Sequence, residues 1–121
     1  MRSYTEIVKE NIEYDILINR NPYDKDRLDG IVDLMLETIC TTRPTVRIGR
    51  EDFPAEVVKS RLLKLDESHI EYVLDSLSKN TTQVRNVRAY LLTTLFRAPT
   101  TIDQYYASLV SHDMANGWNS G

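Results

Sequence analysis

Residues 24–41, DKDRLDGIVDLMLETICT, hold the amphipathic pattern that decides the fold class of this sequence. Apolar side chains recur there every three or four positions, the spacing that places them on one side of an α-helix. Asp24 is a suitable N-cap, and Arg43-Pro44 ends the pattern. We therefore predict a central helix from about Lys25 to Thr41. Its apolar stripe consists of Leu28, Ile31, Val32, Met35 and Ile39, widened by Leu34, Leu36 and Cys40.

The residues before this helix predict one short helix and a turn. Ile7, Val8 and Ile12 have the spacing of a short amphipathic helix, whereas residues 14–18 are expected to be extended. Asn-Pro at positions 21 and 22 is a turn signal that disfavours helix before the proline.

A short β segment is expected at residues 45–53, after the central helix. Thr45-Val46-Arg47-Ile48 is β-branched and alternating, and Gly49-Arg50 follows it, so a hairpin and a single extended excursion both fit. Pro54 suits the first turn of the next helix, and Ser68 with Glu71 has the spacing of a capping box for the one after it. The apolar faces of these two helices are Val57, Val58, Leu62 and Leu65, then Ile70, Val73, Leu74 and Leu77.

The last third of the sequence predicts two further helices. Thr81-Thr82 is expected to cap the first, which Pro99 should end, and Thr100 with Asp103 is expected to cap the second. Residues 115–121 are expected to form a flexible tail. The sum is a mainly α fold in one domain, residues 1–121: a compact bundle of five or six helices with one short β-hairpin or extended excursion near residues 45–53.

Composition agrees with a globular cytoplasmic protein. The 121 residues are 41% hydrophobic and 27% charged, and the formal net charge of −3 argues against a DNA-coating protein. Cys40 is the only cysteine, which excludes an internal disulfide, fits a reducing compartment and predicts a buried, inert thiol. No apolar stretch approaches the ~20 residues of a membrane span, and no signal peptide is visible. We expect a cytoplasmic protein with no membrane partner.

We find no catalytic, metal-binding or cofactor-binding motif, and therefore predict no cofactor and no enzyme activity. His69 and His112 are far apart in sequence, and each is expected to be a surface or helix-cap histidine. Asp24, Asp26, Asp29 and Asp33 lack the register of a calcium loop and fit a solvated helix face. Gly30, inside the central helix, is expected to permit close helix packing.

Basic side chains concentrate in the middle of the chain. Residues 43–97 hold ten basic and seven acidic residues, a balance of +3. These charges could lie on ordinary solvated helix faces, or the fold could assemble them into an anion or nucleic-acid face. Arginine and tyrosine interleaved in the C-terminal third also suit both base stacking and protein interfaces. The candidate contact residues are Arg43, Arg47, Arg50, Arg85, Arg88, Arg97 and Tyr106.

Several stretches in order resemble the C-terminal domain of RepA-type replication initiators (RepA_N family) of Gram-positive plasmids and conjugative elements. They are NPYDKDRLD at 21–29, DFPAEVVKSR at 52–61, VRNVRAYLL at 84–92, APTT at 98–101 and the tyrosine pair at 105–106. That domain is similar to the helical domain of DnaD-like primosome proteins, whose Asn-x-x-x-Tyr-Ile/Leu helix is similar to the stretch with Asn86, Tyr90 and Leu91. The resemblance implies the C-terminal part of a longer initiator.

The resemblance also implies a function. We expect a non-catalytic domain that recruits host replication proteins, a primase or the helicase-loading machinery, during plasmid or mobile-element replication. Arg85, Arg88, Arg97 and Tyr106 are the contact residues that we expect first. Two alternatives stay open: single- or double-stranded DNA binding through the basic region 43–97, and a structural module that forms a homo-oligomer.

Overall fold

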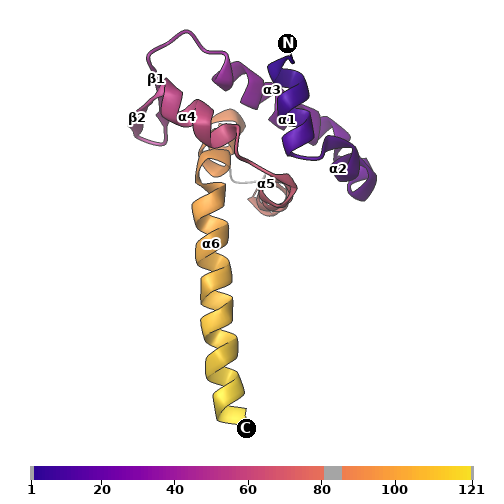
Figure 1. Ribbon diagram of the computed structural model, residues 1–121, viewed down its shortest axis with the longest axis vertical. Coiled ribbons are helices and arrows are strands. Elements are labelled where there is room, and N and C mark those ends of the chain that lie inside the picture. Colours follow the sequence, from indigo (N-terminus) through magenta and orange to yellow (C-terminus); the bar gives the residue numbers. More distant parts are fainter. Residues whose placement is uncertain (1, 81–85, 121) are drawn as a thin grey trace.

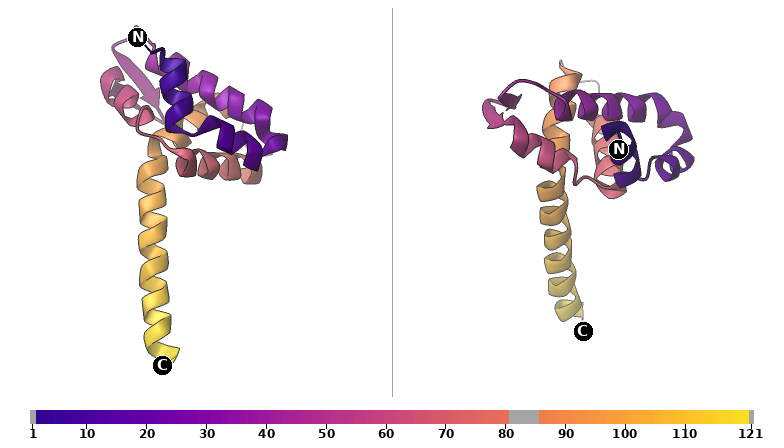
Figure 2. Two further views of the ribbon diagram at one scale, coloured as in Figure 1. Left: turned by 45° about the vertical axis from the view of Figure 1, so that its right-hand side comes forward. Right: turned by 45° about the horizontal axis from the view of Figure 1, so that its top comes forward.

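The computed structural model confirms a mainly α fold with one β-hairpin. It describes the backbone of residues 2–80 and 86–120, and the side chains of residues 2–79 and 86–103. Most elements pack together in a head, from which the C-terminal part of the last helix extends as a long rod (Figures 1 and 2). The elements are α1 (Tyr4–Asn11), α2 (Tyr14–Arg20), the 3-10 turn η1 (Pro22–Asp24), α3 (Lys25–Ile39), β1 (Thr45–Ile48), β2 (Glu51–Pro54), α4 (Ala55–Leu62), α5 (Glu67–Asn80) and α6 (Val87–Ser120).

Helix α3 is the centre of the core, as its sequence predicts. It packs against α1, α4 and α6, and Leu28, Ile31 and Met35 on its apolar stripe are fully buried. Thr38 is also buried, and its hydroxyl donates to the carbonyl of Leu34 at 2.8 Å, so this buried polar group has a hydrogen-bond partner. Cys40 does not follow the prediction: it is the C-cap residue of α3 and is exposed, because it lies one turn after the half-buried Leu36, at the edge of the buried stripe.

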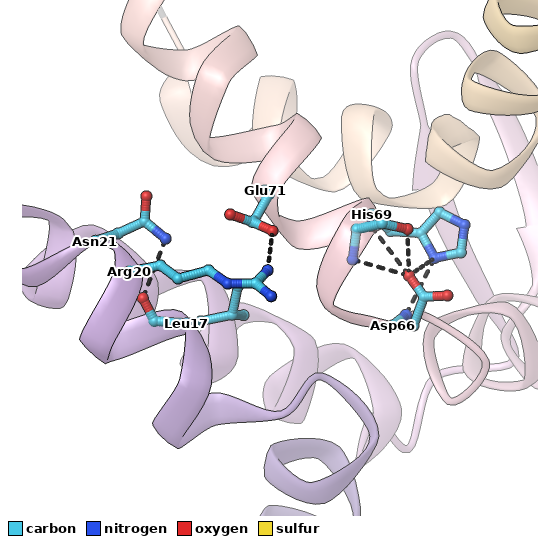
Figure 3. Close-up of polar contacts among 7 residues, drawn as sticks. Leu17, Arg20, Asn21, Asp66, His69 and Glu71 are labelled. Atoms are coloured by element: carbon cyan, nitrogen blue, oxygen red, sulfur yellow. Dashed lines mark hydrogen bonds and ion pairs between the residues drawn. The ribbon is translucent and has the colours of Figure 1, made fainter.

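The predicted extended segment at residues 14–18 is wrong, because α2 is helical. Helix α1 ends at Asn11, and Glu13 takes a left-handed conformation with φ of 52°, which turns the chain into α2. Leu17 is then fully buried, and the Asn21 side chain donates to the Leu17 carbonyl at 3.0 Å (Figure 3). Burial of Leu17 therefore outweighs the weak local preference of this segment.

The hairpin is the β excursion that the sequence predicts near residues 45–53. Its strands are antiparallel, and its two-residue turn begins at Gly49, whose φ of 65° suits glycine. Val46 and Phe53 pair across the strands, so their side chains share one face of the hairpin. That face packs on the helices: the ring centroid of Phe53 lies 4.8 Å from that of Phe96 on α6.

Helix α5 is capped by Asp66, not by Ser68 as predicted. The Asp66 carboxylate accepts from the backbone N–H groups of Ser68 and His69 at 3.0 and 3.1 Å, and His69 Nδ1 accepts from the Asp66 N–H at 3.0 Å (Figure 3). A carboxylate at this position also opposes the positive end of the helix dipole. His69 thus completes a capping box, which confirms the cap-histidine prediction. An ion pair of 2.8 Å between Arg20 and Glu71 joins α5 to α2.

Helix α6 is continuous, so the predicted stop at Pro99 and the new cap at Thr100 are wrong. Asn86 caps its start, since its side-chain oxygen accepts from the Ala89 N–H at 3.0 Å; the predicted cap at Thr81-Thr82 lies outside the described residues. Pro99 removes one helical hydrogen bond, but Ala98 and Ile102 on either side of it are buried against the head and hold the helix together. The backbone of the expected tail is helical to Ser120, and its flexibility stays a prediction. Among the described residues, none of the helices combines the length and apolarity of a membrane span.

Candidate functional site: an arginine groove

Three of the predicted contact arginines line one groove on the head. The groove lies where the end of α3, strand β1 and the start of α6 meet, and its volume is about 390 Å³. We call it the arginine groove and define it by its lining residues: Glu37, Thr38, Thr41, Arg43, Thr45, Val46, Arg47, Arg88 and Leu92. The fold therefore brings together residues more than forty positions apart in the sequence.

Local structure explains how each arginine reaches the groove. Arg43 follows the end of α3, where its backbone N–H donates to the Thr41 hydroxyl at 3.3 Å. Arg47 stands on β1, next to Val46, which packs against the core. Arg88 lies in the first turn of α6, directly after the Asn86 cap. Contacts between β1 and α6 hold the two sides of the groove together.

The three guanidinium groups differ in their partners. Arg88 pairs with Glu37 across the groove at 2.5 Å, and Arg47 pairs with Asp52 at 3.5 Å. Among the described side chains, no carboxylate lies within 4.0 Å of Arg43. Both members of the Arg88–Glu37 pair are more than half exposed, at 64% and 59%, so a ligand can reach and exchange that pair.

The groove combines positive charge with hydroxyl groups and an apolar floor. Thr41 and Thr45 add hydroxyls, while the half-buried Val46 and Leu92 add apolar surface. These side chains suit a ligand that carries a carboxylate or phosphate next to an apolar group. The carboxylate of Glu37 adds a negative charge, so the surface of the groove is not uniformly positive.

The other predicted contact residues do not join this groove. Arg97 follows Arg88 by nine residues, about two and a half helical turns, so it lies on the opposite side of α6. Arg50 is exposed at the tip of the hairpin. Arg85 and the side chain of Tyr106 lie outside the described residues. The sequence prediction missed Glu37, Thr41 and Thr45; only the exposed position of Glu37 on its helix gave a signal.

A second polar cluster ties α2 to α3 and is structural. Asp29 accepts hydrogen bonds from Tyr14 and, at 2.8 Å, from Lys25. These bonds lower the pKa of Asp29, with Lys25 contributing most, and raise the pKa of both Tyr14 and Lys25. A tyrosine with a raised pKa is a poor nucleophile or base at neutral pH. Throughout the described part of the chain, no group of three His, Cys, Asp or Glu side chains could hold a metal ion.

Comparison with known proteins gives one family and no functional relative. No curated protein and no solved structure matches the chain. The model of a family of unknown function (DUF6017) matches residues 1–117, which is nearly the whole chain. The chain therefore belongs to the family of unknown function DUF6017.

Proposed function

We propose that this domain is a non-catalytic recruitment module of a plasmid or mobile-element replication initiator. It binds a host replication protein, a primase or a helicase loader, through the arginine groove. The observation that carries the proposal is the convergence of Arg43, Arg47 and Arg88 on one groove with an apolar floor. The link to replication rests on the resemblance to RepA-type initiators.

The charge pattern of the groove favours a protein partner over DNA. Two of its three arginines already face a carboxylate, Glu37 or Asp52, whereas a DNA track needs cations that neutralise successive phosphates. A partner carboxylate can bind Arg43 directly and compete with Glu37 for Arg88. Apolar side chains of the same partner can cover Val46 and Leu92, and arginines with apolar neighbours are common where binding energy concentrates.

The test is a pull-down of purified host primase and helicase loader with the wild-type chain and two charge-matched variants. Arg43→Glu places a negative charge inside the groove, whereas Arg50→Glu places the same charge at the hairpin tip, outside it. We expect Arg43→Glu to weaken binding by at least about tenfold, the loss of one charge-assisted hydrogen-bonded pair. Arg50→Glu should change binding little, because it alters only the long-range field. Equal effects of the two variants, or no captured partner, would contradict the proposal.

DNA binding remains the second candidate, because Arg43 has no carboxylate within 4.0 Å among the described side chains. Fluorescence anisotropy with single- and double-stranded oligonucleotides at two salt concentrations decides between the candidates. Binding that falls steeply with salt and is lost in Arg43→Glu would replace protein recruitment with DNA binding. Absence of binding even at low salt leaves the recruitment proposal standing. Light scattering on the same samples reports whether the chain forms a homo-oligomer.

A further inference from the structure

A second pocket, beside strand β2 of the hairpin, has a different chemistry from the arginine groove. It lies where β2, α4 and α6 meet, and its volume is about 360 Å³. We call it the junction pocket; it is lined by Phe53, Arg61, Phe96, Arg97, Thr100 and Thr101. It shares no lining residue with the groove, and it has no carboxylate among its lining residues.

The Arg61 guanidinium in the junction pocket lies over one aromatic ring. Its Cζ lies 4.2 Å from the centroid of the Phe96 ring, which in turn packs on Phe53 at 4.8 Å and 48°. Stacking occupies the face of a guanidinium and leaves the N–H donors along its edge free for a ligand. Phe96 itself is buried, with 3% exposed, so it serves as a platform for Arg61. Arg61 is thus positioned before any ligand arrives.

Helix α6 supplies the remaining donors from one side. Thr100 and Thr101 follow Arg97 by three and four residues, the spacing that places side chains next to one another on a helix. Among the described residues, neither Arg61 nor Arg97 has a carboxylate within 4.0 Å. The pocket therefore offers two guanidinium groups without an ion-pair partner there, and two hydroxyl groups.

This donor set matches a phosphate monoester better than a carboxylate. A phosphoryl group carries a charge of about −1.5 to −2 at neutral pH and three acceptor oxygens, enough to engage two guanidinium groups and the hydroxyls together. A carboxylate has one charge and two oxygens, and would leave donors unused. At about 360 Å³ the pocket has space for more than the phosphate alone, and the half-buried Phe53 gives apolar surface for the group that carries the phosphate. We propose that the junction pocket binds a phosphate monoester.

The test uses the whole chain and follows the arginine side-chain N–H signals in NMR titrations. The probes are phenyl phosphate, inorganic phosphate, and a single-stranded oligonucleotide without terminal phosphates. We expect phenyl phosphate to shift the signals of Arg61 and Arg97, with weaker binding of inorganic phosphate. Arg97→Gln should weaken phenyl phosphate binding by about tenfold or more, since it removes a charge-assisted bond. Arg50→Gln, outside the pocket, should stay within about twofold of wild type.

Three results would overturn the proposal. Phenyl phosphate could fail to bind, or Arg50→Gln could weaken it as much as Arg97→Gln, which is the behaviour of a diffuse positive surface. The oligonucleotide could shift the same signals at lower concentration than phenyl phosphate, which would identify a phosphodiester site instead. Arg97 is exposed and makes no described ion pair, so Arg97→Gln should fold even if Arg61→Gln disturbs the aromatic stack. Because Arg43 is outside the junction pocket, failure here leaves the recruitment proposal untouched.

Discussion

Replacing Gly30 by alanine should stabilise the protein, contrary to the close-packing role that its position in the sequence predicts. Gly30 is exposed in the interior of α3, and a Cβ built there has no neighbouring heavy atom within 4 Å. Its φ is not positive, so alanine fits the backbone without strain. A glycine inside a helix costs about 1 kcal/mol relative to alanine, chiefly because the unfolded chain has more freedom to lose.

The expected change in melting temperature follows from the size of the chain. Unfolding releases about 2.1 cal/mol/K per residue, or roughly 250 cal/mol/K for a chain of 121 residues. A gain of about 1 kcal/mol then raises the Tm by about 4 °C. Urea unfolding followed by circular dichroism measures the same gain as a higher midpoint with an unchanged slope.

A second glycine gives the matched control. Gly49 has a φ of 65°, so Gly49→Ala should destabilise the protein by about 1 kcal/mol or more, even though a Cβ there also meets nothing within 4 Å. Opposite signs for Gly30→Ala and Gly49→Ala would show that backbone conformation, not space, separates the two sites. A neutral or destabilising Gly30→Ala would refute the reasoning, because some other surface must then cover this face of α3.

Four further substitutions test the α5 cap, the left-handed residue Glu13 and the groove. Asp66→Ala should cost about 1 kcal/mol by removing the α5 cap, while Asp66→Asn should keep it. Although partial burial opposes it, hydrogen bonds from Ser68 and His69 lower the pKa of Asp66. Its contribution to stability is therefore present above pH about 4 and lost as the pH falls through the folded pKa; acid denaturation of Asp66→Asn should lack that loss. Glu13→Gly should raise stability by about 0.5 kcal/mol. It removes the strain of a left-handed φ of 52°, and the greater conformational entropy of the unfolded chain offsets part of that gain. Glu37→Gln should strengthen capture of an acidic partner by releasing Arg88.

Each of these changes has an outcome that contradicts it. If Asp66→Asn lowered the stability as much as Asp66→Ala does, charge and not hydrogen bonding would stabilise the start of α5. A rise in stability for Glu13→Ala equal to that of Glu13→Gly would remove backbone strain as the cause. Weaker partner capture by Glu37→Gln would show that the Arg88–Glu37 pair itself is recognised.

Local patterns in the sequence were sufficient for the elements that bury one regular face. The α3 stripe from Leu28 to Ile39 and the alternation of residues 45–48 before Gly49 both predicted what the structure contains. Such patterns are reliable because helical and strand periodicities depend only on residues a few positions apart. The prediction that Pro99 ends its helix was wrong, because α6 stays continuous through the burial of Ala98 and Ile102, and the side chains that bury them belong to other elements.

The sites depended on the tertiary structure. Charge counting by itself marked residues 43–97 as basic, but it gave no reason to group Arg88 with Arg43 and to separate it from Arg97. Those groupings follow from the packing of the hairpin against α6, with the arginine groove beside β1 and the junction pocket beside β2. By itself, then, the sequence determined the mainly α class of the fold, its central helix, its hairpin and how much charge the chain carries. Only the packing of distant segments decided which charges meet, because a side chain's neighbours in space are set by element crossings that no local periodicity encodes.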